Sequence, residues 1–156
     1  MRVHAAHAVV QEAGCGALCR LATYAANQRR IAAAGGVGAA VAALRAHITA
    51  PGVLRWGAVA VQHLAADEDN RARAVEAGAI SAVVKALAAH PTNPGLQDFG
   101  CRALSALVAT HADKKQAADA GAGEVLRAAL ARFPAHAGVQ ARAAATLQAI
   151  SFQIAG

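Results

Sequence analysis

The sequence predicts an all-α solenoid of three-helix repeats, each 43 residues long. One observation is that the chain matches itself three times at this offset, and a fixed period in the low forties is typical of helical solenoids. Another is that glycine turns and apolar positions recur in register. The equivalent residues include Ala34-Gly35, Ala77-Gly78 and Ala120-Gly121; Leu44, Leu87 and Leu130; and Leu64, Leu107 and Ile150. Because solenoids build long concave surfaces that bind other chains, the repeat also indicates a class of activity.

Each repeat is expected to begin with a short basic helix. The three ranges are 28–34, 71–77 and 114–120. Asn70 and Asp113 stand where the second and third of these helices need an N-cap, a position that favours Asn and Asp. Gly35, Gly78 and Gly121 are expected to end the helices, because glycine readily adopts the left-handed conformation that follows many helices.

A second helix and a longer third helix are expected to complete each repeat. The second helices are predicted at 37–47, 80–90 and 123–133, and the third helices at 53–66, 96–109 and 139–152, with residues 9–23 aligned to the third type. Apolar residues at helical spacing, such as Val37, Val41 and Leu44, support the second helix. Turn residues separate the two helices, as in Pro51-Gly52 and Pro94-Gly95.

The whole chain is predicted to be one array. Residues 1–26 form a partial repeat, and 27–69, 70–112 and 113–156 form full repeats, so that the array covers 1–156. The partial repeat is recognised because residues 1–4 align with residues 44–47, the end of a second helix. Neither end carries the polar cap that an isolated array usually needs. We therefore expect a fragment of a longer array or self-association through the uncapped ends.

Composition indicates a soluble protein inside the cell, in the cytoplasm or the nucleus. The chain is 56% hydrophobic but only 3% aromatic, so small side chains let helices approach closely. The uncharged stretch from Ile31 to Leu44 is too short for a membrane span, which needs about 20 residues. His4 and His7 interrupt any apolar signal-peptide region. We expect no contact with a membrane.

Neither disulfides nor metal sites are expected. Cys15 and Cys101 occupy one repeat position two periods apart, roughly 20 Å if repeats stack at about 10 Å, which is beyond the reach of a disulfide. We interpret them as small buried hydrophobes. His4, His47 and His90 also share one repeat position, and that spacing is too wide for a common zinc ion. No cofactor is predicted.

The helix order resembles the armadillo repeat, and the resemblance covers nearly the whole chain. Residues 27–37 are similar to that family's first helix and glycine turn, and residues 10–22 to its third helix. Two-helix HEAT repeats have a similar period, but the short first helix and the glycine after it favour the armadillo family. The resemblance implies a right-handed superhelix whose third helices line a concave groove, and a role in protein binding or scaffolding.

The groove is expected to be lined by third-helix positions one turn apart. These residues are Glu12, Gly16, Arg20, Arg55, Val59, His63, Asp98, Arg102, Ser105, Ala141, Ala145 and Gln148. Peptide-binding relatives of the importin-alpha type carry a groove-facing Asn in each repeat with a Trp one turn earlier. Here Arg20 and His63 occupy two of the Asn positions, and Gly16 and Val59 two of the Trp positions. We therefore do not expect binding of a nuclear localisation signal.

Three arginines are the candidate ligand-binding residues. Arg20, Arg55 and Arg102 belong to successive repeats and are predicted to grip carboxylates or phosphates through paired hydrogen bonds. The alternative is that they are solvated, or paired with Glu12 and Asp98 along the groove. A net charge of +6 fits an acidic protein segment or another polyanion as the ligand.

The leading prediction is a non-catalytic module that binds a protein partner, an acidic or helical segment, in the groove. One alternative is a basic nucleic-acid-binding solenoid, which predicts strongly salt-dependent affinity; the acidic groove residues and the missing aromatic interleaving count against it. Another is a purely structural part of a longer array. No phosphate-binding loop or nucleophile motif is present, so we expect no enzyme activity.

Overall fold

The computed structural model describes residues 1 and 3–151, and these residues form ten helices and no strand. The helices are α1 (Ala8–Ala22), α2 (Ala25–Ala33), α3 (Gly36–Ala46), α4 (Pro51–Leu64), α5 (Glu68–Glu76), α6 (Ala79–Ala89), α7 (Pro94–Leu107), α8 (His111–Asp119), α9 (Ala122–Arg132) and α10 (Ala137–Ser151). The predicted all-α class is confirmed. Residue 152, the predicted end of the last third helix, lies outside the described residues. The same holds for residues 153–156, the end of the predicted 113–156 repeat.

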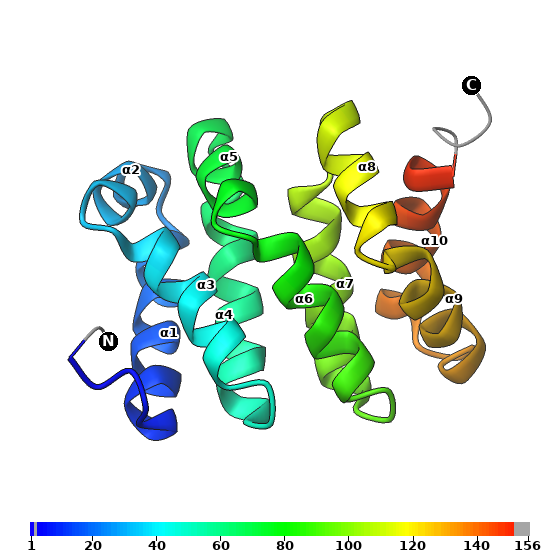
Figure 1. The fold of residues 1–156 in the computed structure, drawn as a ribbon, viewed down its shortest axis with the longest axis horizontal. Coiled ribbons are helices and arrows are strands. Elements are labelled where there is room, and N and C mark those ends of the chain that lie inside the picture. Colours follow the sequence, from blue (N-terminus) through cyan, green and yellow to red (C-terminus); the bar gives the residue numbers. More distant parts are fainter. Residues whose placement is uncertain (2, 152–156) are drawn as a thin grey trace.

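Helices of one type begin at a constant spacing. The third-type helices begin at Ala8, Pro51, Pro94 and Ala137, the first-type at Ala25, Glu68 and His111, and the second-type at Gly36, Ala79 and Ala122. Figure 1 shows α3, α6 and α9 in front, α2, α5 and α8 along the upper edge, and the third-type helices behind. Each third-type helix packs against the next. This elongated stack of three-helix units is the arrangement of a helical solenoid.

The first-type helices begin three residues earlier than the sequence predicted. The N-caps of α5 and α8 are Asp67 and Thr110, so the prediction of Asn70 and Asp113 as N-caps was wrong. The Asp67 carboxylate accepts a hydrogen bond from the Asn70 backbone N–H at 3.1 Å. Thr110 and Asp113 exchange the two bonds of a capping box, which satisfies N–H groups that have no partner within the helix. Asn70 and Asp113 are instead the third residues of their helices, and both are buried.

The other helix boundaries differ less from the prediction. The second-type helices begin one residue earlier than predicted, and α4 and α7 begin two residues earlier, at Pro51 and Pro94. Both prolines were assigned to turns. Proline suits the first position of a helix, because its missing N–H would have no intrahelical partner there.

The glycine turns have the conformation that the sequence predicted. Gly35, Gly78 and Gly121 have φ angles of 77°, 87° and 85°, in the left-handed region. A residue with a Cβ atom is disfavoured in this region. These glycines therefore set the direction in which each second-type helix leaves its first-type helix.

The start of the chain packs as the equivalent residues of the next repeat do. The Leu44 side chain lies so close to Gly57 that a methyl group on this glycine would overlap with it. The Met1 side chain lies against Gly14 in the same way. Met1 thus occupies the place in the partial repeat that Leu44 occupies in the full one.

A recurring glutamine, which the sequence interpretation did not use, links α1, α7 and α10 to the preceding chain, whereas α4 has Leu54 at this position. The Gln97 side-chain amide donates to the carbonyls of Leu87 and His90 at 2.9 and 3.0 Å. Gln11 and Gln140 make the equivalent pairs of bonds in their repeats. These hydrogen bonds could have been predicted, because a polar residue recurs at one position of an otherwise apolar helix face.

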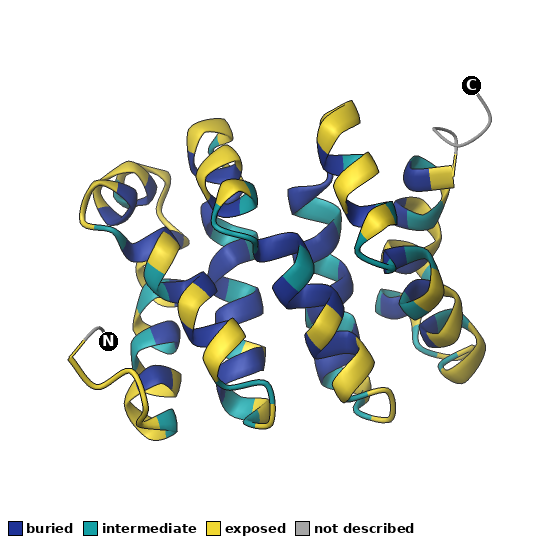
Figure 2. Cartoon of the chain, in the orientation of Figure 1, coloured by how far each residue is buried: buried dark blue, intermediate teal, exposed yellow. Residues whose placement is uncertain are grey.

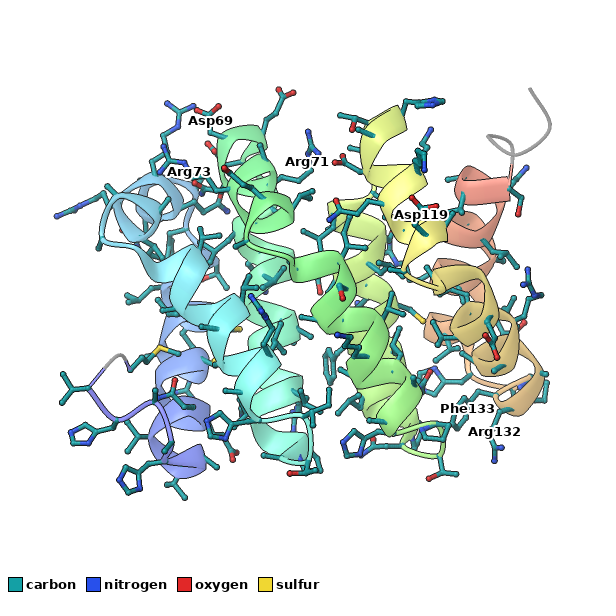
Figure 3. All side chains as sticks on the ribbon, viewed as in Figure 1. Asp69, Arg71, Arg73, Asp119, Arg132 and Phe133 are labelled. Atoms are coloured by element: carbon teal, nitrogen blue, oxygen red, sulfur yellow. The ribbon has the colours of Figure 1, made fainter. Side chains whose placement is uncertain are left out.

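Polar side chains also connect neighbouring repeats. Arg71 extends from α5 toward α8, where it forms a buried ion pair with Asp113 (Figure 3). Burial acts to raise the pKa of Asp113, but hydrogen bonds from Thr110 and the charge of Arg71 outweigh it and hold the pKa below its usual value. One repeat earlier, the Asn70 side-chain amide donates to the Gln28 carbonyl at 3.1 Å.

The apolar core runs along the array rather than toward one centre. Figure 2 shows that buried residues dominate α4, α6 and α7 in the middle, whereas α1, α2 and α9 near the two ends carry more exposed residues. Leu44, Leu64, Leu87 and Leu104 are among the largest fully buried side chains. Among the described residues, no helix combines the length and the apolar character that a membrane span requires.

Candidate functional site

The residues predicted to line the groove lie on α1, α4, α7 and α10, and none of them is buried. Glu12, Arg20, Arg55, Ala141, Ala145 and Gln148 are exposed, and Gly16, Val59, His63, Asp98, Arg102 and Ser105 are half-buried. We call these twelve residues together the third-helix face. Since α1 packs on α4, α4 on α7 and α7 on α10, equivalent positions lie on neighbouring helices. A ligand along this face could contact several repeats at once.

Arg55 is held between two aromatic rings on this face. Its guanidinium carbon lies 4.9 Å from the ring centroid of Trp56 and 5.4 Å from that of Phe99. Both distances are within the range of cation–π attraction. Trp56 and Phe99 share one repeat position and pack partly against the core. The rings therefore restrain a guanidinium that has no acidic partner at ion-pair distance among the described residues.

Arg102 is different because its charge is already paired. Its Nε donates to both carboxylate oxygens of Asp98 at 3.1 Å. The alternative of pairing along the groove therefore holds for Arg102. Arg20 is exposed on α1, and within the described part of the chain no carboxylate pairs with it. The structure thus leaves Arg55 and Arg20, but not Arg102, with an unpaired charge.

A hollow of about 470 Å³ opens beside Arg55. Its walls come from Pro51, Gly52, Arg55, Asn93, Gly95, Leu96 and Phe99. Asn93 caps α7, since its side-chain oxygen accepts a hydrogen bond from the Leu96 N–H at 3.0 Å. The sequence interpretation assigned Gly95 only to a turn and missed the place of Asn93 and Gly95 beside the arginine. Only the packing of α4 against the start of α7 brings these residues together.

Two of the three positions equivalent to Arg55 carry the opposite charge, and the third is Ala141. The carboxylates of Glu12 and Asp98 lie over Gly52 and Gly138, the second residues of α4 and α10, where a methyl group would overlap with them. A carboxylate is stabilised at a helix N-terminus by the helix dipole. Arg55 lies at the corresponding place beside α7, so the N-terminus of this helix has a cation next to it. An anion in the hollow would interact favourably with both groups.

The repeated histidines connect repeats to each other. A ring nitrogen of His47 lies 2.6 Å from the Ala5 carbonyl oxygen, and one of His90 lies 2.8 Å from that of Ile48. Each ring therefore hydrogen-bonds the chain of the preceding repeat. No group of three or more His, Cys, Asp or Glu residues with a metal-binding arrangement occurs in residues 1 and 3–151.

The cysteines are buried and unbonded, as the sequence interpretation expected. Burial raises the pKa of Cys15 to about 11 and that of Cys101 to about 12. A thiol must lose its proton to act as a nucleophile, so these side chains are suited to packing and not to chemistry.

Comparisons with protein-family models, with curated proteins and with solved structures found no match to this chain.

Proposed function

We propose that the chain is a non-catalytic, armadillo-type interaction module that binds an acidic segment of a protein partner along the third-helix face. The 43-residue spacing of the helix starts and the order of the three helix types support the family assignment. The unpaired Arg55, restrained by Trp56 and Phe99 beside a hollow, carries the functional part of the proposal. Three free thiols support a location inside the cell, where thiols stay reduced.

In this proposal, Arg55 is the main anchor for the ligand. A carboxylate of the partner enters the hollow and accepts two parallel hydrogen bonds from the guanidinium, a geometry that lysine cannot reproduce. Leu96 and Phe99 form the apolar side of the same hollow and contact the carbon atoms of the bound segment. Because the rings already restrain Arg55, less side-chain entropy is lost on binding.

The remaining positions of the face extend the contact to neighbouring repeats. Val59 and His63 lie one and two turns further along α4 and are half-buried. Arg20 adds a second unpaired positive charge on α1. Since these groups are near the surface, affinity is expected to fall as salt screens the charges.

The proposal is tested by capture of partners from cell extract with three single variants. Arg55→Glu reverses the anchor, and Arg102→Glu reverses a charge that Asp98 already neutralises. Arg132→Glu is the matched control, because Arg132 is an exposed arginine in the last turn of α9 (Figure 3) and does not belong to the third-helix face. Each capture is run before and after nuclease treatment, so that proteins and nucleic acids are distinguished.

We expect a nuclease-resistant protein partner that Arg55→Glu loses, that Arg102→Glu retains at least in part, and that Arg132→Glu retains fully. Material that disappears with nuclease would favour the nucleic-acid alternative. An identical pattern for the Arg55 and Arg132 variants would contradict a site at Arg55 and favour a purely structural role.

A further inference from the structure

Two unpaired charges of opposite sign lie on neighbouring helices of the third-helix face. Glu12 on α1 and Arg55 on α4 occupy equivalent repeat positions, and α1 packs against α4 (Figure 1). Both side chains are exposed. Among the described residues, neither has a group of opposite charge at ion-pair distance. The face thus presents a carboxylate and a guanidinium that do not neutralise each other.

The Glu12 carboxylate lies at the edge of the hollow that Arg55 borders. It is placed over Gly52, where a methyl group would overlap with both of its oxygens. Gly52 is at the same time a wall residue of the hollow. A ligand that enters the hollow therefore meets a negative charge beside the positive one. A segment with acidic residues alone would be attracted by Arg55 and repelled by Glu12.

The two side chains extend in the same direction along the array. Glu12 reaches from α1 to the start of α4, and the guanidinium carbon of Arg55 lies 5.4 Å from the ring centroid of Phe99 on α7. Because each side chain reaches the following helix, the two charges remain one repeat apart. This separation is about 10 Å, the distance between the axes of packed helices.

Other charged residues of the face do not alter this pattern. Asp98 accepts two hydrogen bonds from Arg102, and its side chain is only 13% exposed. Ala141 on α10 is neutral. Arg20 lies two turns further along α1 than Glu12, which is about 12 Å along the helix axis. A ligand at the hollow therefore meets one negative and one positive charge, in this order along the array.

We propose that the partner segment carries a basic residue three positions from the acidic residue that binds Arg55, and that this basic residue pairs with Glu12. The proposal rests on the proposed function, because it adds a second contact to the same site. A polyproline II segment fits the two charges, since it rises about 3.1 Å per residue and returns to the same side every third residue. A β-strand does not, because its residues three apart point to opposite sides.

The test is a selection of random peptides, displayed on phage, against the full chain and three variants. Glu12→Gln removes the proposed contact for the basic residue, and Arg55→Gln removes the anchor for the acidic residue. Glu124→Gln is the matched control, because Glu124 is an exposed glutamate of α9 outside the third-helix face. Since all three side chains are exposed, none of the changes should unfold the protein, and circular dichroism checks this.

We expect the peptides retained by the natural chain and by Glu124→Gln to share an acidic residue with Lys or Arg three positions away. Glu12→Gln should still select the acidic residue but no basic residue at this spacing. Arg55→Gln should no longer select the acidic residue.

A double-mutant cycle then measures the contact itself. A selected peptide is remade with Gln in place of its basic residue, and its affinity is compared with that of the original peptide. The affinity for the natural chain should fall by about two- to fivefold, which corresponds to an exposed ion pair. The affinity for Glu12→Gln should not change.

The outcomes separate a failure of this inference from a failure of the proposed function. Acidic peptides without a basic residue at this spacing, or a basic residue that Glu12→Gln still selects, would overturn the pairing with Glu12 and leave Arg55 as the anchor. The absence of acidic peptides from the natural chain, or their retention by Arg55→Gln, would overturn the proposed function and this inference together.

Discussion

The two ends of the array carry different residues at positions that the interior repeats bury against a neighbour. At the N-terminal end, Leu18 and Leu21 are as apolar as their buried counterparts on α4, although they are partly exposed. At the C-terminal end, an exposed Arg127 stands where Val41 is fully buried. The N-terminal end thus retains the apolar residues of an interior interface, whereas the C-terminal end carries a charged residue at one of these positions.

This difference shows that repeat position alone does not determine the residue. The aromatic pair Trp56 and Phe99 has Arg142 as its equivalent on α10, where that side chain is exposed. A repeat position carries an apolar residue where another helix covers it, and it can carry a charged residue where it is exposed to solvent. Leu18 and Leu21 depart from this relation, because both are apolar and partly exposed.

The largest effect is expected from one substitution made at two equivalent positions. Leu64→Ala should destabilise the protein by about 2–5 kcal/mol, because it leaves a cavity in a fully buried site. Leu21→Ala should cost less than about 1 kcal/mol, since half of that side chain is already in water. Chemical denaturation of both variants measures the two values. Similar losses would contradict the contrast between interior and end.

The next effect concerns the ion pair between repeats. Arg71→Ala leaves Asp113 buried without its partner, which should cost about 3 kcal/mol. Lys114 is the equivalent residue of the last repeat. It is half-buried and has no acidic partner at ion-pair distance among the described residues. Lys114→Ala should therefore change stability little. Equal effects of the two substitutions in thermal unfolding would show that the pair does not join the repeats.

The same pair predicts a dependence of stability on pH. The pKa of Asp113 is lower in the folded chain than in the unfolded one. Its contribution is therefore complete above the unfolded pKa of about 3.9 and is lost as the pH falls through the folded pKa. Asp113→Asn should make the acid-induced loss of stability less steep. An unchanged acid profile in urea unfolding at several pH values would contradict this assignment.

A smaller effect is expected at Gly100, which packs against the Leu87 side chain. Gly100→Ala should destabilise by about 1–3 kcal/mol, because the new methyl group overlaps with the Leu87 side chain. The equivalent residue of the last repeat is already alanine, Ala143, and Leu130 above it is less buried. Ala143→Gly should therefore cost about 1 kcal/mol through helix propensity. A stabilising Gly100→Ala would show that the interior repeats pack more loosely than described.

The smallest change is expected at a buried hydroxyl. Thr146 Oγ1 has no hydrogen-bond partner in the described part of the chain, and the equivalent residues Ala60 and Ala103 are alanine. Thr146→Ala should leave stability unchanged or raise it by about 1 kcal/mol, since an unsatisfied buried polar group is removed. A clear loss in calorimetry would indicate that the hydroxyl has a partner.

The sequence predicted the helix types, their order and the glycine turns because these follow from local spacing. It did not predict the N-caps, because the two cap positions carry different residue types, Asp67 and Thr110. Three residues later, the similar residues Asn70 and Asp113 recur and have the side chains of typical caps. The pairing of Asp98 with Arg102 follows from their spacing on one helix. The stacking of Arg55 on Phe99 does not, since it depends on how α4 and α7 pack against each other.

Photo-crosslinking tests the proposed binding face most directly. A photoreactive amino acid is placed at Val59 on α4 or, as a control, at the exposed Lys85 on α6, in nuclease-treated cell extract. We predict a protein adduct from Val59 that is absent from Lys85 and that disappears when Arg55→Glu is added. Equal adducts from both positions, or an adduct from Val59 that persists in the Arg55 variant, would contradict the assignment of the third-helix face as the binding surface.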